Sequence, residues 1–413
     1  MKYYGIFMRG RVNRVIPSIA VLTVFFGLSL PSFAQNNVVI DSLAKFGFEE
    51  LRYAEDSSRV VYTLENNVYR LQASGIKEAL TIIKNNGGID SSKECVLILT
   101  DMNVPKVAVT LEAGKGESEL MIQDWSVSNS GYDKAWNLVR DAARTNRSFG
   151  DVDINVYPQL YLKNVIINQI YQCLLEISPA VEVTLWKGAK FTGQIIFPVI
   201  NDGYKNEYMN IRPGYITLQQ AFRLPFNAWG DVRVGVFDTR SYGAEVNVSV
   251  PIDGKHWTVN GKFAYLGCGV FESFSHFYYN GQYTPTWSVG PDYYWSRFNV
   301  QCRLRVEQYL GKEVGVRADA FRHFKYCAVG LYFQKAFTSA IAGNGGFRIY
   351  VTLPPYKYKR YRKAPRVDTG LSTGMTYNGN NEFEHYFYPV TLADDTPTKQ
   401  NQYNASYIKS YLK

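Results

Sequence analysis

The residue types best suited to chemistry are few and scattered in this sequence. Histidine occurs at four positions, His256, His276, His323 and His385. A hydrolase needs a nucleophile, a general base and an orienting carboxylate within reach of one another. Neither His256, at the start of an expected strand, nor His323, near an expected turn, belongs to a recognisable catalytic motif. The sequence therefore favours a protein that is not an enzyme, with a hydrolase built on His256 or His323 as the less favoured alternative.

No metal or cofactor site is expected either. The segment Gly114–Ser118 has the composition of a phosphate-binding loop, but it lacks the spacing that wraps backbone amides around a phosphate. The five cysteines, an odd number, fit no metal-binding spacing. Cys302 and Cys327 fall beside aliphatic residues on one face of their strands, where a thiol behaves as a small hydrophobe. We therefore expect inert cysteines and no cofactor.

A stronger chemical signal is charge at alternate positions of expected strands. Between Trp295 and Val306, arginines and amides alternate with apolar residues. Three arginines on one face of a strand cannot all face lipid or a dry core, so they face water or a wet lumen. The candidate lumen-facing residues for binding are Glu182, Arg233, Glu245, Arg297, Arg303, Arg305, Arg317 and Asp319.

Two arrangements of these charges are open. The carboxylates Glu182, Glu245 and Asp319 could pair with arginines 297, 303, 305 and 317 in an ion-pair network that fills and rigidifies a narrow barrel. Alternatively, the arginines could form a charged ring that selects a permeant anion. A barrel of about twelve strands leaves little open bore, which favours the network.

The elements that must position these charges have a period of two from Asp151 onward. Segments of this kind, separated by turn signals such as Asp253-Gly254, number about twelve between Asp151 and Pro355. A length of about ten residues crosses a bilayer when the strand is tilted. We expect a mostly β protein with a transmembrane antiparallel β-barrel over residues 149–355. A soluble β-sandwich is the alternative, and the one-sided arginines and the 15% aromatic content argue against it.

The N-terminal residues predict export. Basic residues at positions 2, 9, 11 and 14 precede the apolar run Ile16–Leu30, and the small residues Ser32 and Ala34 stand ahead of Gln35. This pattern predicts a cleaved signal peptide over residues 1–34, because a membrane anchor would need about 20 apolar residues. Without those four cations the formal net charge of +9 becomes only mildly basic, too little to indicate nucleic acid. Lipid A phosphates or an acidic polysaccharide would suit it as partners.

The barrel is expected to lie between two smaller parts. Residues 35–148 predict a small α+β domain, with strands at 50–54 and 59–64, a helix ending at Gly87-Gly88, a hairpin around Asp101–Asn103 and a helix capped by Asp133. Residues 356–413 predict a basic and polar C-terminal tail. The tail is either a solvated extension or a strap against lipid phosphates or a partner.

Two groups of segments resemble a known family. The first group is FGFEELR at 46–52, VYTLENNVYR at 61–70 and GIKEAL at 75–80. The second is VEVTLWKG at 181–188, IRPG at 211–214, FRLP at 222–225 and GDVRVGVF at 230–237. Together they resemble the YjbH-like family of outer-membrane proteins tied to exopolysaccharide and capsule production, in a short form of the kind found in Bacteroidetes.

The resemblance covers most of the mature chain and carries no catalytic residues. It implies an outer-membrane component of polysaccharide export or surface assembly, with its N-terminal domain in the periplasm beside periplasmic and lipoprotein partners. The chain has room for one barrel only, so a role that needs the second half of the longer relatives is not implied. A small-solute porin-like channel or a general surface scaffold is the alternative function.

Overall fold

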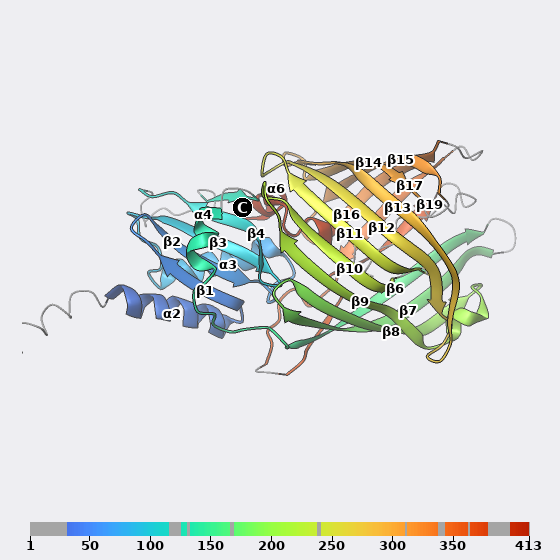
Figure 1. Ribbon diagram of the computed structural model, residues 1–413, viewed down its shortest axis with the longest axis horizontal. Coiled ribbons are helices and arrows are strands. Elements are labelled where there is room, and N and C mark those ends of the chain that lie inside the picture. Colours follow the sequence, from blue (N-terminus) through green and yellow to red (C-terminus); the bar gives the residue numbers. More distant parts are fainter. Residues whose placement is uncertain are drawn as a thin grey trace, which may run out of the picture.

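The computed structural model describes residues 31–114, 125–129, 133–165, 169–237, 241–309, 312–337, 343–361, 364–378 and 397–412. Residues 1–30 of the expected signal peptide, most of the 114–118 loop, His385 and residues 362–363 of the basic run lie outside these ranges. The described chain is mostly β and forms two sheets, one of five strands and one of 14 (Figure 1).

The smaller sheet has the order β1-β2-β3-β4-β5, with only the β2–β3 pair parallel. Its strands are β1 (Glu49–Glu55), β2 (Arg59–Glu65), β3 (Glu94–Asp101), β4 (Val104–Leu111) and β5 (Ser126–Ser128). Its helices are α2 (Pro31–Phe46), α3 (Gln72–Asn85) and α4 (Asp133–Val139). These elements agree with the α+β pattern expected for this part of the chain.

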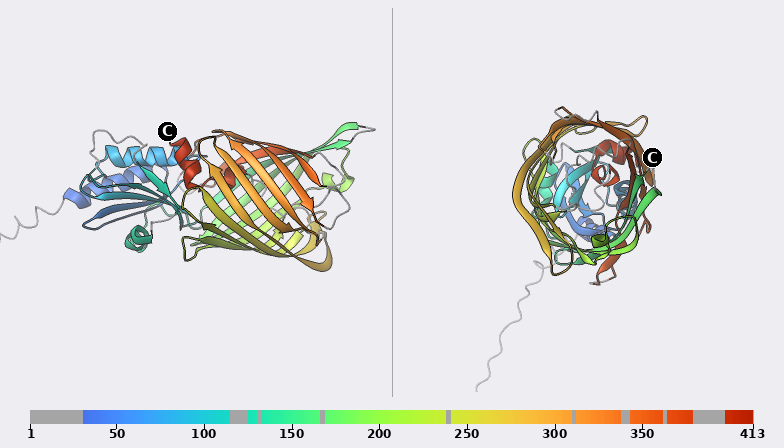
Figure 2. Two further views of the ribbon diagram at one scale, coloured as in Figure 1. Left: turned by 90° about the horizontal axis from the view of Figure 1, so that it is seen from above. Right: turned by 90° about the vertical axis from the view of Figure 1, so that its right-hand side faces the viewer.

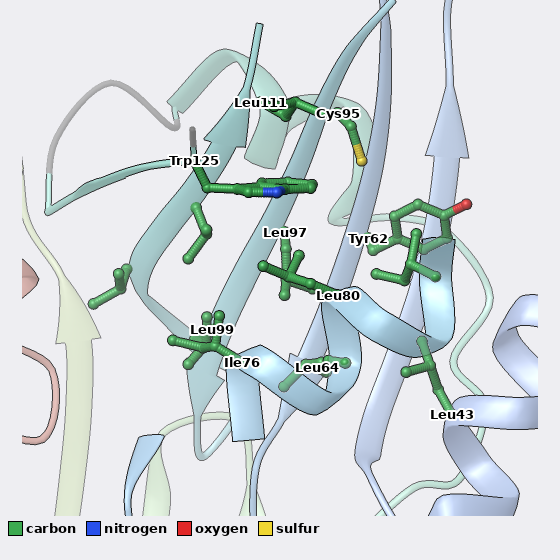
Figure 3. Close-up of a cluster of buried hydrophobic side chains, with 14 of the residues drawn as sticks. Leu43, Tyr62, Leu64, Ile76, Leu80, Cys95, Leu97, Leu99, Leu111 and Trp125 are labelled. Atoms are coloured by element: carbon green, nitrogen blue, oxygen red, sulfur yellow. The ribbon is translucent and has the colours of Figure 1, made fainter. Parts of the chain in front are cut away.

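The main core of the smaller sheet lies between its strands and helices α2 and α3. Ile76, Leu80 and Ile83 recur at helical spacing in α3 and are buried. Leu43 of α2 and Leu97 of β3 meet them in one cluster (Figure 3). A second, smaller cluster on the other face of the sheet holds α4, so helices cover both faces.

The β3–β4 connection shows how local sequence determines this sheet. Met102 and Asn103 both have positive φ, 51° and 62°, and Asp101 pairs directly with Val104. A two-residue hairpin loop with positive φ at both central positions matches the right-handed twist of its strands. The hairpin predicted around Asp101–Asn103 is therefore confirmed.

The larger sheet runs from β6 to β17 as consecutive antiparallel neighbours. Its first strands are β6 (Val152–Val165), β7 (Gln169–Trp186), β8 (Ala189–Asp202), β9 (Arg212–Arg223), β10 (Trp229–Phe237), β11 (Ser241–Pro251) and β12 (Trp257–Phe271). The following strands are β13 (Phe277–Trp295), β14 (Val300–Gln308), β15 (Val314–His323), β16 (Cys327–Ala336) and β17 (Asn344–Thr352). A short 3-10 helix, η3 (Asn206–Met209), connects β8 to β9.

The sheet nearly closes because both of its ends come from one short stretch of chain. β18 (Arg366–Thr369) pairs in parallel with the start of β6, and β19 (Ser372–Asn378) pairs antiparallel with β17. Thr373 Oγ1 also donates to the carbonyl of Pro158 in β6, 3.0 Å away. Seen end-on, the strands form a ring (Figure 2).

This closure corrects two expectations. The sheet has 14 strands rather than about twelve, and the chain after Pro355 is more than a tail. That part supplies β18 and β19 and the helices α5 (Pro397–Gln400) and α6 (Ala405–Tyr411). Its polar composition suggested a solvated extension. Many of its polar side chains are instead buried against partners, as Asp368 is against Arg70.

Candidate functional site

All but one of the candidate lumen residues lie on the inward face of the 14-stranded sheet, buried or partly buried. Glu182 lies in β7, Arg233 in β10, Glu245 in β11, Arg303 and Arg305 in β14, and Arg317 and Asp319 in β15. Apolar residues at the alternate positions of these strands point outward. The strand alternation therefore located the polar face of the sheet.

Arg297 is the exception. Trp295 pairs with Val300, so the expected strand from Trp295 to Val306 is in fact the end of β13, a turn and β14. Asn299 in the turn has a φ of 52°, a left-handed conformation that asparagine tolerates better than most residues. The turn contains no glycine or proline, so the alternation passed through it without a visible break.

Glu182 sits in a small buried cluster near the start of the sheet. Lys190 Nζ of β8 lies 2.7 Å from Glu182 Oε2, and Tyr157 of β6 donates its hydroxyl proton to Oε1 at 2.6 Å. The carboxylate is thus paired with a lysine rather than with one of the expected arginines.

Glu245 is at the centre of a larger cluster on β10, β11 and β12. Its side chain is fully buried, with Arg233 and Lys262 each 3.4 Å from one of its oxygens. Asn247 Nδ2 donates to Glu245 Oε1 at 2.9 Å. Arg233 also reaches Asp231, with Nε 2.7 Å from Oδ2. Two carboxylates and two cations balance each other here.

The arginines of β14 share one carboxylate. Arg303 Nε lies 3.6 Å from Asp292 Oδ2 on β13, and Arg305 contacts Asp292 Oδ1 directly. Gln301 Nε2 lies 3.5 Å from the same side chain. Asp292 was absent from the expected set because Gly290 and Pro291 interrupt the polar–apolar alternation before it.

Arg317 and Asp319 form the pair whose geometry is the most specific. Arg317 Nε and Nη2 donate to the two oxygens of Asp319, each at 2.8 Å, a bidentate arrangement. Arg348 of β17 lies 3.9 Å from the same carboxylate. Both guanidinium groups also lie over the ring of Tyr332, Arg348 at 4.7 Å and Arg317 at 5.7 Å from its centroid.

These contacts favour the ion-pair network over the ring of one charge sign. Of the pairings expected from sequence, the structure forms Arg317 with Asp319, while Glu182, Glu245, Arg303 and Arg305 take other partners. Lys190, Asp231, Asp292 and Arg348 were not anticipated, although Asp231 and Arg348 do lie on alternating strands. The partner of each charge depends on the register between strands, which periodicity alone does not give.

The C-terminal segment, residues 397–412, enters the mouth of the barrel-like sheet that faces the smaller sheet (Figures 1 and 2). Asn401 is buried there, and its Nδ2 donates to Gln301 Oε1 at 2.6 Å and lies 3.2 Å from His323 Nε2. The ring of Tyr407 in α6 meets the ring of Tyr294 edge-on, with centroids 5.9 Å apart. The segment thus occupies part of the interior.

The same segment binds the smaller sheet on its other side. Asn129, just after β5, donates from Nδ2 to the carbonyl of Tyr403 at 2.7 Å. The backbone N–H of Gln72, at the start of α3, donates to Gln402 Oε1 at 3.1 Å. Ile408 of α6 belongs to the main core cluster of the smaller sheet. The C-terminal segment therefore joins the two sheets.

A second junction joins the sheets through two arginines. Arg366 of β18 lies 3.4 Å from Glu49 Oε1 and contacts Asp153 of β6. Arg360 lies 3.3 Å from the same Glu49 oxygen and also contacts Asp153. Both arginine side chains are almost fully buried. This cluster fixes β1 of the smaller sheet against the first strand of the larger one.

The described histidines have structural neighbours. His256 Nδ1 lies 3.0 Å from Ser406 Oγ and 3.1 Å from the carbonyl of Tyr294. His323 is buried beside Gln301 and Asn401. His276 lies on the surface with its Nε2 3.5 Å from Glu272. Ser406 donates to the carbonyl of Lys255 at 2.8 Å, which turns its proton away from His256.

The cysteines are free, and burial raises the pKa of Cys95 in the smaller sheet to about 12. A thiol with such a pKa stays protonated and unreactive at neutral pH. Within the described ranges, no cluster of three or more histidine, cysteine, aspartate or glutamate side chains is arranged to hold a metal ion. None of the described helices has the length and apolar character needed to cross a membrane.

Comparison of the chain with protein-family models, with curated proteins and with solved structures found no match. The resemblance to the YjbH-like family therefore rests on the quoted segments alone.

Proposed function

We propose that this chain is an outer-membrane β-barrel protein with its smaller sheet in the periplasm. The observation that carries the proposal is the contrast between the two faces of the same strands. In β16, Val329, Leu331 and Phe333 are 41%, 66% and 51% exposed, while Tyr332 and Gln334, at the alternate positions, are buried on the inward side. An apolar surface of this extent is unfavourable in water and favourable against lipid.

Strand length and aromatic placement support the same proposal. Strands such as β14 (9 residues) and β15 (10 residues) have the length that crosses the bilayer core when tilted. Exposed aromatic residues gather at both ends of the sheet, as expected for interfacial girdles. Those near the smaller sheet include Trp186, Trp257, Trp295 and Phe324, and those at the far end include Phe274, Tyr278, Tyr279 and Tyr283.

Within the outer membrane, we propose a non-enzymatic role in exopolysaccharide or capsule export or surface assembly. The resemblance in segments 46–80 and 181–237 supports this role. The interior also supports it, because a lumen lined with paired charges offers an acidic glycan replacement partners for charge-assisted hydrogen bonds. The C-terminal segment in the mouth suits guidance or docking better than a permanently open pore. The smaller sheet would dock a periplasmic or lipoprotein partner.

The test of this role is genetic. Deletion of the gene is expected to remove or reduce surface polysaccharide, and the intact gene is expected to restore it. A variant carrying Arg303→Gln and Arg305→Gln should restore less, while Lys335→Gln, an exposed cation on the outward face, should restore fully. Heat-dependent gel mobility of each variant would show that it folds. Unchanged polysaccharide in the deletion strain would refute the role.

Planar-bilayer conductance provides the second measurement. The proposal predicts little steady current through the purified protein, and any current present should fall when an acidic oligosaccharide is added. A steady open conductance that ignores the oligosaccharide would instead favour a small-solute channel.

A further inference from the structure

Three cations gather at the edge of the barrel-like sheet that faces the smaller sheet. Arg297 lies in the β13–β14 turn, Arg322 near the end of β15 and Lys325 in the β15–β16 turn. Val300 pairs with Arg322, and His323 N–H donates to the carbonyl of Asn299 at 2.8 Å, so the two turns are neighbours. We call Arg297, Arg322 and Lys325 the rim cations.

The rim cations line an open hollow. A cavity of about 270 Å³ is lined by both turns, by His323 and by Tyr411 at the end of α6. His323 contributes a buried Nδ1 with no hydrogen-bond partner among the described residues. Asn299 likewise contributes a buried side-chain oxygen without a described partner. Both atoms are shielded from solvent, so the groups that the hollow offers to a ligand are the rim cations.

The charge of this cluster is not balanced. In the part of the chain that the structure describes, no carboxylate lies within 4.0 Å of Arg297, Arg322 or Lys325. The inward arginines contrast with them, since Arg303, Arg305 and Arg317 each have an aspartate partner. Arg297 lies over Phe298 and Arg322 over Phe324, with the guanidinium carbon 5.4 and 5.3 Å from the ring centroids. These contacts hold the side chains at the rim without neutralising them.

The cluster adjoins the apolar outward face. By register, Arg322 belongs to the outward row with Ala320, whereas Phe321 and His323 point inward and are buried. Trp295, Phe298 and Phe324 are exposed beside the cations, and the exposed Leu304 continues the same face toward the middle of the sheet. A soluble anion would leave these aromatic side chains in water, whereas a lipid would cover them.

We propose that the rim cations bind the phosphate of an anionic phospholipid head group in the periplasmic leaflet. This inference rests on the proposed membrane-spanning role. Arginine guanidinium groups recognise phosphate oxygens in a bidentate way, and the lysine adds a point charge. Without a carboxylate to bind an ammonium group, the cluster should prefer phosphatidylglycerol to zwitterionic phosphatidylethanolamine. The exposed aromatics would lie at the level of the glycerol backbone and upper acyl chains.

Native mass spectrometry of the full chain in nonionic detergent tests the proposal. The wild type is expected to bind short-chain phosphatidylglycerol more tightly than phosphatidylethanolamine. Arg297→Gln, Arg322→Gln and Lys325→Gln together should weaken phosphatidylglycerol binding on the order of 100-fold, from about fivefold for each cation near a membrane surface. Binding of phosphatidylethanolamine should change little. Lys205→Gln, Lys312→Gln and Lys335→Gln, three exposed lysines at the opposite end, form a control of equal charge.

Two further arms separate the possible ligands. Inorganic phosphate and glycerophosphoglycerol, which lack acyl chains, should compete with phosphatidylglycerol only weakly. Equally strong competition would show that the rim cations bind a free anion and not a lipid. An unchanged affinity of the triple variant for phosphatidylglycerol would overturn the proposed site. The comparison of the two lipids on the wild type does not depend on any variant folding.

The same sample separates failure of the proposed membrane role from failure of the lipid site. A chain that is folded and soluble without detergent would remove the proposed membrane role and this inference with it. A chain that is sheet-rich and heat-modifiable in micelles, but binds both lipids equally, would overturn the lipid site alone.

Discussion

Asp319 holds two arginines together on the inward face of β15. Its side chain is only 5% exposed and accepts two hydrogen bonds from Arg317, with Arg348 close by. Asp319→Asn would leave both guanidinium groups near each other without a compensating charge. Breaking a buried pair from one side costs about 3 kcal/mol or more. We expect the variant to unfold at lower urea concentration in lipid vesicles, as measured by heat-dependent gel mobility.

The control is Asp202→Asn, at an exposed position near the far end of β8. It removes the same charge from a carboxylate in contact with solvent, where an ion pair contributes little. Its midpoint should match that of the wild type. If the two variants were equally stable, the inward face would be too well hydrated for the pair to contribute.

Glu65 gives the smaller sheet a pH dependence. Burial raises the pKa of its carboxyl well above the usual range, and nearby Asp101 raises it further, while the N–H of Met102, which donates at 2.8 Å, acts in the opposite direction. Glu49 and Glu50 also raise it, whereas Arg52 carries the opposite charge nearby. As pH rises above the usual carboxyl pKa, the unfolded chain loses its proton before the folded chain does. Stability present at acidic pH is therefore lost toward neutral pH.

Glu65→Gln should remove this loss, because the amide is neutral at every pH and its oxygen can still accept from Met102. In the affected pH window, the free energy of unfolding of the wild type should fall by on the order of 1 kcal/mol per pH unit relative to the variant. Thermal unfolding of the full chain at pH 5 and pH 8 measures this difference. Glu112→Gln, at an exposed position, should leave the wild-type slope intact. If the free energy of unfolding of Glu65→Gln fell with pH as steeply as that of the wild type, the pH dependence would belong to another group.

At the scale of elements, sequence was informative wherever one strand or helix determines its own pattern. The amphipathic spacing of Ile76, Leu80 and Ile83 identified α3, and alternation identified the polar face of β14 and β15. β18 was missed because four residues are too few for a clear pattern, and β19 because it is mostly polar, with Met375 and Tyr377 as its only large apolar residues. They are strands only because β6 and β17 each leave an edge to pair with. The partners of Glu182 and Arg303 were missed for a related reason, since strand register determines them.

The position of the C-terminal segment could not be predicted from its own sequence either, because its polar residues bind groups that are far away in the chain. Asn401 contacts Gln301 and His323, and Tyr403 contacts Asn129. We predict that removing residues 397–413 opens the mouth of the barrel-like sheet. The truncated protein should show a larger and steadier conductance in planar bilayers than the intact chain.

A milder variant serves as the matched comparison for this prediction. Asn404 caps α6 by accepting from the N–H of Tyr407 at 2.9 Å, and its replacement by alanine should cost about 1 kcal/mol. Asn404→Ala should therefore open only briefly. Its mean conductance should lie between that of the intact chain and that of the truncated chain. Equal conductance of all three proteins would mean that the smaller sheet or the ion pairs, and not this segment, close the interior.

At the scale of the whole molecule, charge and apolar surface are sorted by position. Opposite charges meet on the inward face, apolar side chains cover the outward face, and unbalanced cations stand at the rim beside the smaller sheet. The junctions made by Arg360 and Arg366 and by the C-terminal segment keep the smaller sheet at one mouth. In the proposed membrane setting, this polarity would give the molecule one orientation, with the smaller sheet on the aqueous side.

The outward face gives the sharpest test of that arrangement. Leu331 lies in the middle of β16, is 66% exposed and neighbours Ala320 and Phe347 on adjacent strands. An arginine on the lipid face near the bilayer midplane costs about 2–4 kcal/mol. Leu331→Arg should therefore lower the folded fraction in vesicles, measured by heat-dependent gel mobility. Phe226→Arg, in the β9–β10 turn and 90% exposed, should fold as the wild type does. If Leu331→Arg instead folded normally and stayed in solution without detergent, the outward face would meet water, and the membrane role would be lost.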